Sequence, residues 1–320
     1  MPSHITHNQL YLDVYKNLPE QMKREFKDTW EKYKIFGQGH DLLFFYMFLH
    51  IHKFPTLLKQ LQIIEDKDVQ QLTINYVNYL IENNPTHESK LFLYGYLMHH
   101  FLDAKLHPLI IYETGDFLNN KESQANHLLL ENMLDAYMLK KNLIDPKKFK
   151  IYSLVPSRAA LTRDTREMIS YSFKKTYEFE NFDKVFAEYN KNTETFMWLL
   201  RHDPKGIKQF LFKPLDYVLK KAIKPSVLPF HFDGTEAEEY LNKQKEMWTH
   251  PIDTNNTSIK SYDELYEEGV SEIAKMVSLL NAAILDKATD KELATIVPDV
   301  SSIHGYKVEG SYNIENTKKI

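Results

Sequence analysis

The sequence predicts an all-α protein, and two features support this class. Only nine of the 320 residues are glycine, whereas 20 are tyrosine and 19 are phenylalanine, a composition that favours long packed helices over a turn-rich β fold. Apolar residues recur at the spacing of a helix face through most of the chain. No low-complexity linker divides the sequence. We therefore expect one helical domain over residues 1–286, followed by a C-terminal extension or loose tail at 287–320.

The first expected elements are two helices and a turn. Ser3 can cap a first helix, whose apolar pattern is broken at Leu18 and Pro19. A second, more charged helix is expected over residues 20–33. The Gly-Gln-Gly segment at 37–39 then indicates a turn.

The most apolar segment begins near His40 and contains FFYMFLHIHKF, which suits a helix that is buried on nearly all sides. Pro55 is expected to end or kink this helix, because proline lacks a backbone N–H and clashes with the preceding turn. Further helices are expected between polar, proline-bearing or glycine-bearing loops, over residues 67–83, 88–112, 121–142, 163–178, 182–202, 206–222, 235–248 and 262–286.

Composition and charge exclude several classes of function. The chain contains no cysteine, which excludes disulfides, thiolate zinc fingers, iron–sulfur clusters and cysteine nucleophiles. Its net charge is -4 without a long run of either sign, so we expect no broad basic face for duplex nucleic acid. No apolar run approaches the roughly 20 residues of a membrane span, and the N-terminus lacks a secretory pattern. We therefore expect no transmembrane segment and a cytoplasmic location.

Histidine is concentrated towards the N-terminus, with ten of the 14 histidines in the first 127 residues. His99, Asp103 and His107 are spaced four residues apart, so on a helix their side chains form one stripe. His127 and Glu131 repeat this spacing in the next expected helix. Helical bundles build internal metal sites from such pairs on neighbouring helices.

Two interpretations of these pairs are open. They are either salt-bridged pairs on a solvated face or ligands of a buried cation. Asp103 and Glu131 lie in stretches rich in Leu, Phe and Tyr, and burial of an unpaired carboxylate is costly, so the cation is favoured. Nitrogen and oxygen ligands without thiolates suit zinc best, with manganese and iron as alternatives.

The segment GYLMHHFLDAKLHP at 95–108 resembles the signature of the zinc-dependent phospholipase C family. In that family a histidine, an aspartate four residues later and a further histidine before proline lie on a buried helix, followed by a His and a Glu four apart. The resemblance covers most of the chain, from about residue 15 to residue 285. Four further stretches agree with it, namely the N-terminal PSHITH, GQGHDLLFFY at 37–46, the pair His50 and His52, and EMWTHPI at 246–252.

The resemblance implies a multi-helix bundle of the phospholipase C and single-strand nuclease type, which encloses two to three zinc ions. Asp103 would bridge two ions, and Asp41 would also be the catalytic residue that takes a proton from the attacking water. The implied activity is hydrolysis of a phosphodiester, in a phospholipid or another substrate, by metal-activated water. The implied metal ligands are His7, Asp41, His52, His99, Asp103, His107, His127 and Glu131.

Some ligand assignments stay open at this point. His52 is preferred to His50 because it lies 11 residues after Asp41, about three helical turns. His4 can substitute for the N-terminal tryptophan ligand of secreted family members. His40 replaces the proline expected before Asp41, and three roles are open for it: an added ligand, a filler of the loop or a proton shuttle, with the filler favoured.

The function also has alternatives. One is a single-strand nuclease or nucleotidase of the same fold, and another is a non-catalytic helical protein that metal stabilises.

His100 is expected to be structural, because it points about 100° away from the stripe of His99.

Overall fold

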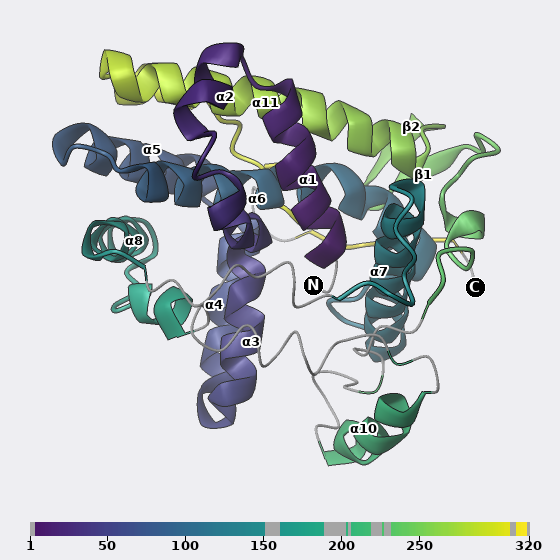
Figure 1. Cartoon of the computed structure of the whole chain (residues 1–320). Helices are drawn as coiled ribbons and strands as arrows, with labels where there is room; N and C mark the ends of the chain where they lie inside the picture. The colour runs from purple at the N-terminus through teal and green to yellow at the C-terminus, as the bar shows by residue number, and fades with distance from the viewer. Residues whose placement is uncertain are drawn as a thin grey trace.

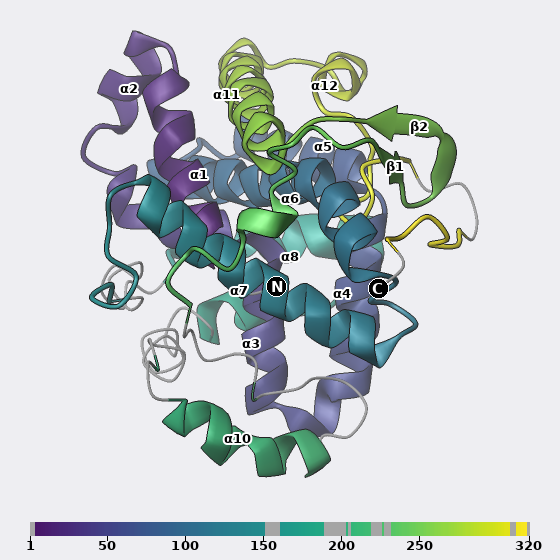
Figure 2. The same ribbon diagram turned by 90° about the vertical axis from the view of Figure 1, so that its right-hand side faces the viewer.

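The computed structural model describes residues 4–150, 161–188, 203, 206–218, 226, 232–307 and 312–318. Within these residues the chain is mostly helical, with one two-stranded antiparallel sheet (Figures 1 and 2). The predicted all-α class is therefore confirmed. The more specific bundle type stays a prediction.

The first part of the chain, up to residue 141, forms a continuous series of helices and two 3-10 segments. In order they are α1 (His4–Asn17), α2 (Glu20–Phe26), the 3-10 segment η1 (Glu31–Asp41), α3 (Leu42–Leu49), the 3-10 turn η2 (Ile51–Lys53), α4 (Phe54–Asp66), α5 (Val69–Glu82), α6 (His87–Thr114) and α7 (Lys121–Lys141).

The second part adds further helices and the sheet. They are α8 (Arg163–Tyr177), α10 (Ile207–Val218), the 3-10 turn η5 (Glu238–Tyr240), β1 (Trp248–His250), β2 (Asp253–Ser258), α11 (Tyr262–Asp286) and α12 (Asp290–Ile296). In the hairpin, Trp248 pairs with Ser258 and His250 pairs with Asp253, with an irregularity between them. Figures 1 and 2 show α11 on one side of the molecule and α10 on the opposite side.

Helix α6 is the central element and carries several of the candidate metal ligands. A capping box between Thr86 and Ser89 starts it, satisfying backbone groups that a helix end leaves unpaired. Helices α1, α7, α8 and α11 and segment η1 pack around it, so it is buried on nearly all sides. This placement explains why its sequence lacks a polar face.

Two glycines allow η1 to lie directly on α6. A Cβ at Gly95 would come within 2.6 Å of the carbonyl carbon of Phe36, closer than two carbons can approach. A Cβ at Gly39 would lie 2.6 Å from Cβ of His99. Gly39 also has φ of 50°, a conformation that glycine adopts readily. The turn expected at 37–39 therefore lies directly against α6.

Several expected elements differ from the structure. Pro55 does not end a helix; it lies in the first turn of α4, where its missing N–H has no helical partner to lose. The helix expected at 235–248 is wrong, because only Glu238–Tyr240 is helical and β1 begins at Trp248. Asn242 and Lys245 have positive φ, which breaks a helix there.

The expected helix at 182–202 and the end of the expected helix at 206–222 are described only in part. Residues 183–188 are helical, and residues 189–202 lie outside the described part of the chain. Residues 219–222 also lie outside it. Among the described residues, none of the helices combines the length and the apolar character needed to cross a bilayer.

For residues 287–320 the sequence left an extension or a loose tail open, and several of these residues pack against the rest of the protein. Ser301, Ser302, Ile303 and His304 are buried. The backbone N–H of Lys318 donates a hydrogen bond to the carbonyl of Tyr112 on α6. Residues 301–307 and 312–318 are not helical, so helical periodicity gives no sign of these contacts. The contacts fix part of residues 287–320 against the central helix.

Candidate metal centre

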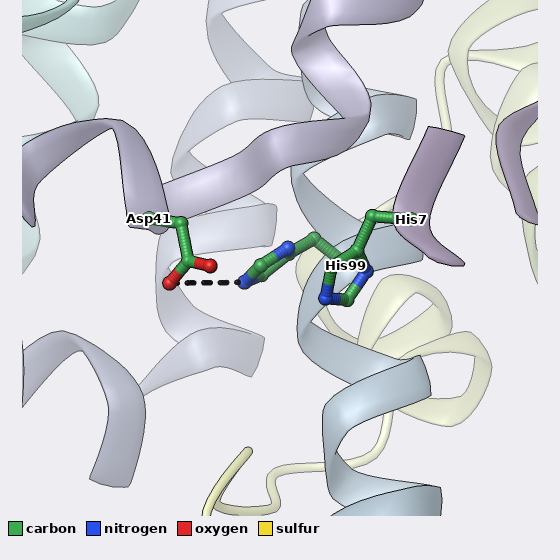
Figure 3. A group of neighbouring side chains, drawn as sticks. All are labelled: His7, Asp41 and His99. Carbon is green, nitrogen blue, oxygen red and sulfur yellow. Dashed lines mark ion pairs between the residues drawn. The ribbon is translucent and has the colours of Figure 1, made fainter. Parts of the chain in front are cut away.

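Three elements bring the first group of side chains together. His7 comes from α1, Asp41 from the end of η1 and His99 from α6 (Figure 3). The ring centroids of His7 and His99 are 3.9 Å apart. Nε2 of His99 lies 3.8 Å from Oδ1 of Asp41, as the dashed line in Figure 3 marks.

Asp103 lies between this group and a second one. Its Oδ2 is 3.1 Å from Nε2 of His99, and its Oδ1 is 3.1 Å from Nε2 of His7. The same Oδ1 is 4.0 Å from Nε2 of His107, one turn further along α6. The i, i+4 spacing thus places one carboxylate within reach of imidazoles on both sides.

The second group joins α6 and α7. Oε1 of Glu131 lies 3.5 Å from Nε2 of His107 and 3.3 Å from Nε2 of His127. Phe117 stacks on the ring of His127, with ring centroids 4.4 Å apart. The side chains of His107, His127 and Glu131 are all buried.

Among the described residues, four sets of three side chains hold potential ligand atoms within 4.8 Å of one another. The structure brings seven of the eight predicted metal ligands into these sets. It adds Glu65, which the sequence did not indicate, and His40, for which the sequence favoured a loop filler over a ligand. The sets are His7, Asp41 and His99; His40, His99 and Asp103; His107, His127 and Glu131; and His40, Asp41 and Glu65.

His52 is the exception and requires a correction. Its side chain is exposed and belongs to none of the four sets formed by the described residues. The preference for it assumed an unbroken helix after Asp41, but α3 ends at Leu49 and the 3-10 turn η2 changes the direction of the chain. His50 is not at the centre either, because its Nε2 lies 3.0 Å from Oε1 of Glu188.

His4 is buried but also belongs to none of the four sets among the described residues. Its Nδ1 is hydrogen-bonded to the side-chain oxygen of Gln38, whose amide donates back to the carbonyl of His4 at 3.0 Å. This pair ties the start of α1 to η1. The structure therefore gives His4 a contact that joins two elements of the centre.

Asp135 positions His7 from the neighbouring helix. Its carboxylate accepts hydrogen bonds from the backbone N–H groups of Ile5 and Thr6, at 3.1 and 2.8 Å, and from the Thr6 hydroxyl at 2.8 Å. These donors are the free N–H groups of the first turn of α1. Asp135 lies one turn after Glu131 on α7, so α1 is aligned with the second group.

The C-terminal segment orients the histidines of α6. Nδ1 of His107 donates to the carbonyl of Ser302 at 2.7 Å, which leaves Nε2 facing Asp103 and Glu131. Metal-binding histidines are commonly fixed by such a bond to a carbonyl. Nε2 of His100 bonds the carbonyl of Val300 at 2.8 Å, so this residue points away from the stripe, as predicted.

Burial and mutual charge shift the acid–base equilibria of the centre. Burial lowers the pKa of His99 to about 3 and raises that of Asp41 to about 7. Burial opposes a charge on His107, but the carboxylates of Asp103 and Glu131 raise its pKa to about 9. Without another cation, His107 therefore carries the positive charge between these two acids.

The donor set fits a metal ion. Nδ1 of His99 and Nδ1 of His40 are buried without a hydrogen-bond partner in the described part of the chain. Each such group costs about 1–3 kcal/mol if it stays unsatisfied. Two ligands about 2.0 Å from a tetrahedral zinc ion lie about 3.3 Å apart, which is within the 3.1–4.0 Å observed between these acids and imidazoles.

A cavity of about 230 Å³ gives access to the second group. His107, His127 and Glu65 form part of its wall, and Leu58 and Lys121 lie elsewhere on it. A ligand in this cavity would therefore meet imidazoles of the centre directly.

Comparison of the chain with protein-family models, with curated proteins and with solved structures gives no match. Membership in the phospholipase C family therefore stays a prediction from the sequence segments that resemble it. The arguments that follow rest on the residues of the centre.

Proposed function

We propose that the protein is a metal-dependent hydrolase that acts on phosphodiesters, as the resemblance to zinc-dependent phospholipase C implies. The observation that carries the proposal is the position of Asp103. Its two oxygens face His7 and His99 on one side, and Oδ1 also lies 4.0 Å from Nε2 of His107 on the other. A shared carboxylate of this kind suits two neighbouring ions.

When bound, zinc lowers the pKa of a coordinated water towards 7 and offsets charge that develops on a phosphate. The chain supplies the other components. Asp41 is a buried carboxylate beside His99, and it is placed to accept a proton from an attacking water at one of its oxygens. His107 and His127 lie on the cavity wall, where a phosphodiester would be oriented against the centre.

A single-strand nuclease or nucleotidase is a second candidate, favoured by the cavity wall. Phe117 and Lys121 both line the cavity. Proteins bind single-stranded nucleic acid with aromatic side chains, on which the bases stack, and with cations, which contact the phosphates. A non-catalytic metal protein is a weaker candidate, because a purely structural site has no need of an open cavity.

The test compares hydrolysis of bis-p-nitrophenyl phosphate, phosphatidylcholine vesicles and single-stranded DNA by the untagged protein. Asp103→Asn is expected to lower turnover of the preferred substrate at least about 100-fold, as loss of a charge shared by two ions should. Glu113→Gln is the matched control, because Glu113 is a buried acid of α6 that pairs with Lys318 at 3.0 Å.

Lipid turnover would support the phospholipase C form of the proposal, and DNA turnover the nuclease form. In either case chelation of the metal should abolish the activity while Glu113→Gln retains it. Zinc-loaded protein that hydrolyses none of the three substrates would leave the non-catalytic candidate and overturn the proposal.

A further inference from the structure

Glu65 lies near the end of α4 and faces the centre. Nothing in its sequence context marks it as a ligand. It lies 24 residues after Asp41, in a helix that was not expected from the sequence. Its Oε1 is 3.9 Å from Nε2 of His40. Together with Asp41 these two residues form one of the four sets of potential ligands.

A direct contact between His40 and Glu65 does not account for this arrangement. A separation of 3.9 Å is too long for a hydrogen bond between nitrogen and oxygen. His40 is only 1% exposed, its Nδ1 has no hydrogen-bond partner in the described structure, and its ring packs edge-on against His99 at 4.5 Å. Nδ1 of His40 is therefore held against the centre without a hydrogen-bond partner among the described residues.

The backbone of Glu65 is fixed to the same segment that orients His107. The carbonyl of Glu65 accepts a hydrogen bond from the N–H of Ser302 at 2.7 Å, and the carbonyl of Ser302 accepts from Nδ1 of His107 at 2.7 Å. The next residue, Asp66, accepts from the hydroxyl of Ser301 at 2.8 Å. The end of α4 thus has a defined position relative to α6.

We propose that His40, Asp41 and Glu65 hold a further divalent ion of this centre. The inference rests on the metal centre of the proposed function and deepens it. The resemblance offers His52 and an N-terminal group as the remaining ligands, but His52 lies elsewhere in the structure. His40 and Glu65 take the place of these ligands. His40 is then a ligand and not a filler of the loop.

The position of Glu65 gives this ion a role with respect to substrate. Glu65 lines the same cavity as His107 and His127. An ion at Glu65 and an ion at His107 would therefore both border the cavity that a phosphodiester would enter, and neighbouring metals can hold the attacking and leaving oxygens of such a substrate.

Zinc titration of the metal-free, untagged full chain, followed by native mass spectrometry, tests the assignment. The wild-type protein is expected to bind three zinc ions. Glu65→Gln and His40→Gln are each expected to bind one ion fewer, and the double variant no fewer than either single variant. Glu113→Gln, a buried acid of α6 outside the centre, should bind as many ions as the wild type.

The outcome separates this inference from the proposed function. A wild type that binds zinc and hydrolyses phosphodiesters, with Glu65→Gln and His40→Gln keeping every ion, would overturn the inference alone. If a variant binds zinc only about 10–100-fold more weakly and keeps every ion, the residue acts from outside the coordination sphere. That result would also overturn the inference. Far-UV circular dichroism checks folding, and if Glu65→Gln does not fold, the ion count of His40→Gln decides.

Discussion

Gly39 is the residue whose replacement tests the link between the backbone and the metal centre most sharply. Its φ and ψ of 50° and -131° lie in a region that residues with a Cβ avoid. Adopting such a conformation costs about 1–3 kcal/mol for a non-glycine residue. The added Cβ of Gly39→Ala would also meet Cβ and Cγ of His99 at 2.6 Å.

Relief of this overlap requires His99 or η1 to move, and overpacking of this kind costs about 1–3 kcal/mol more. We therefore expect Gly39→Ala to lower the free energy of unfolding by about 2–6 kcal/mol in total. Because His99 is the side chain that is displaced, the variant should also lose zinc. Gly206→Ala is the control, since Gly206 has φ of 63° but only the Gln209 side chain nearby, at 3.5 Å.

Urea denaturation with and without zinc, together with the zinc content of each variant, measures both effects. Gly206→Ala should cost about 1–2 kcal/mol, from backbone strain alone, and should keep its zinc. Equal destabilisation of the two variants, with full zinc content in Gly39→Ala, would refute the view that η1 is pressed against His99.

Three further outcomes are expected. Gly95→Ala, whose Cβ would lie 2.6 Å from the Phe36 carbonyl carbon, should lower the unfolding free energy by about 1–3 kcal/mol in urea denaturation, and an unchanged midpoint would contradict the close packing of η1 on α6. Asp135→Ala removes three hydrogen bonds at the start of α1 and should cost at least about 1.5–3 kcal/mol and weaken zinc binding through His7, which calorimetric zinc titration checks. The metal-free protein should lose stability as the pH rises from 6.5 to 9. Neighbouring acids raise the pKa of His107 to about 9 and burial raises the pKa of Glu65 to about 8, so the folded state binds more protons than the unfolded state in this interval. Urea denaturation in EDTA that shows a flat or rising stability would contradict this.

The sequence predicted the parts of the centre that depend on local geometry. The four-residue spacing of His99, Asp103 and His107 is enough to align them on a helix, and His127 with Glu131 follows the same rule. The structure brings these residues together as the spacing indicates. The all-α class likewise follows from composition and periodicity.

The parts that were missed depend on contacts between distant segments or on breaks in a helix. Glu65 reaches the centre only because α4 packs beside η1, which no spacing along the chain encodes. His52 was chosen by counting turns across a segment where the helix stops at Leu49. The carbonyl of Ser302 lies far along the chain from His107, and backbone acceptors leave no trace in side-chain patterns.

The zinc content of untagged protein, purified without chelator and measured by plasma mass spectrometry, tests the central claim most directly. At least two zinc ions per chain are expected in the wild type and in Glu113→Gln, and three if the site at His40, Asp41 and Glu65 is filled. In Asp103→Asn the ions on both sides of that carboxylate should be lost together. Absence of zinc from the wild type even after reconstitution would contradict the account, and the aligned histidines and acids would then be packing residues only.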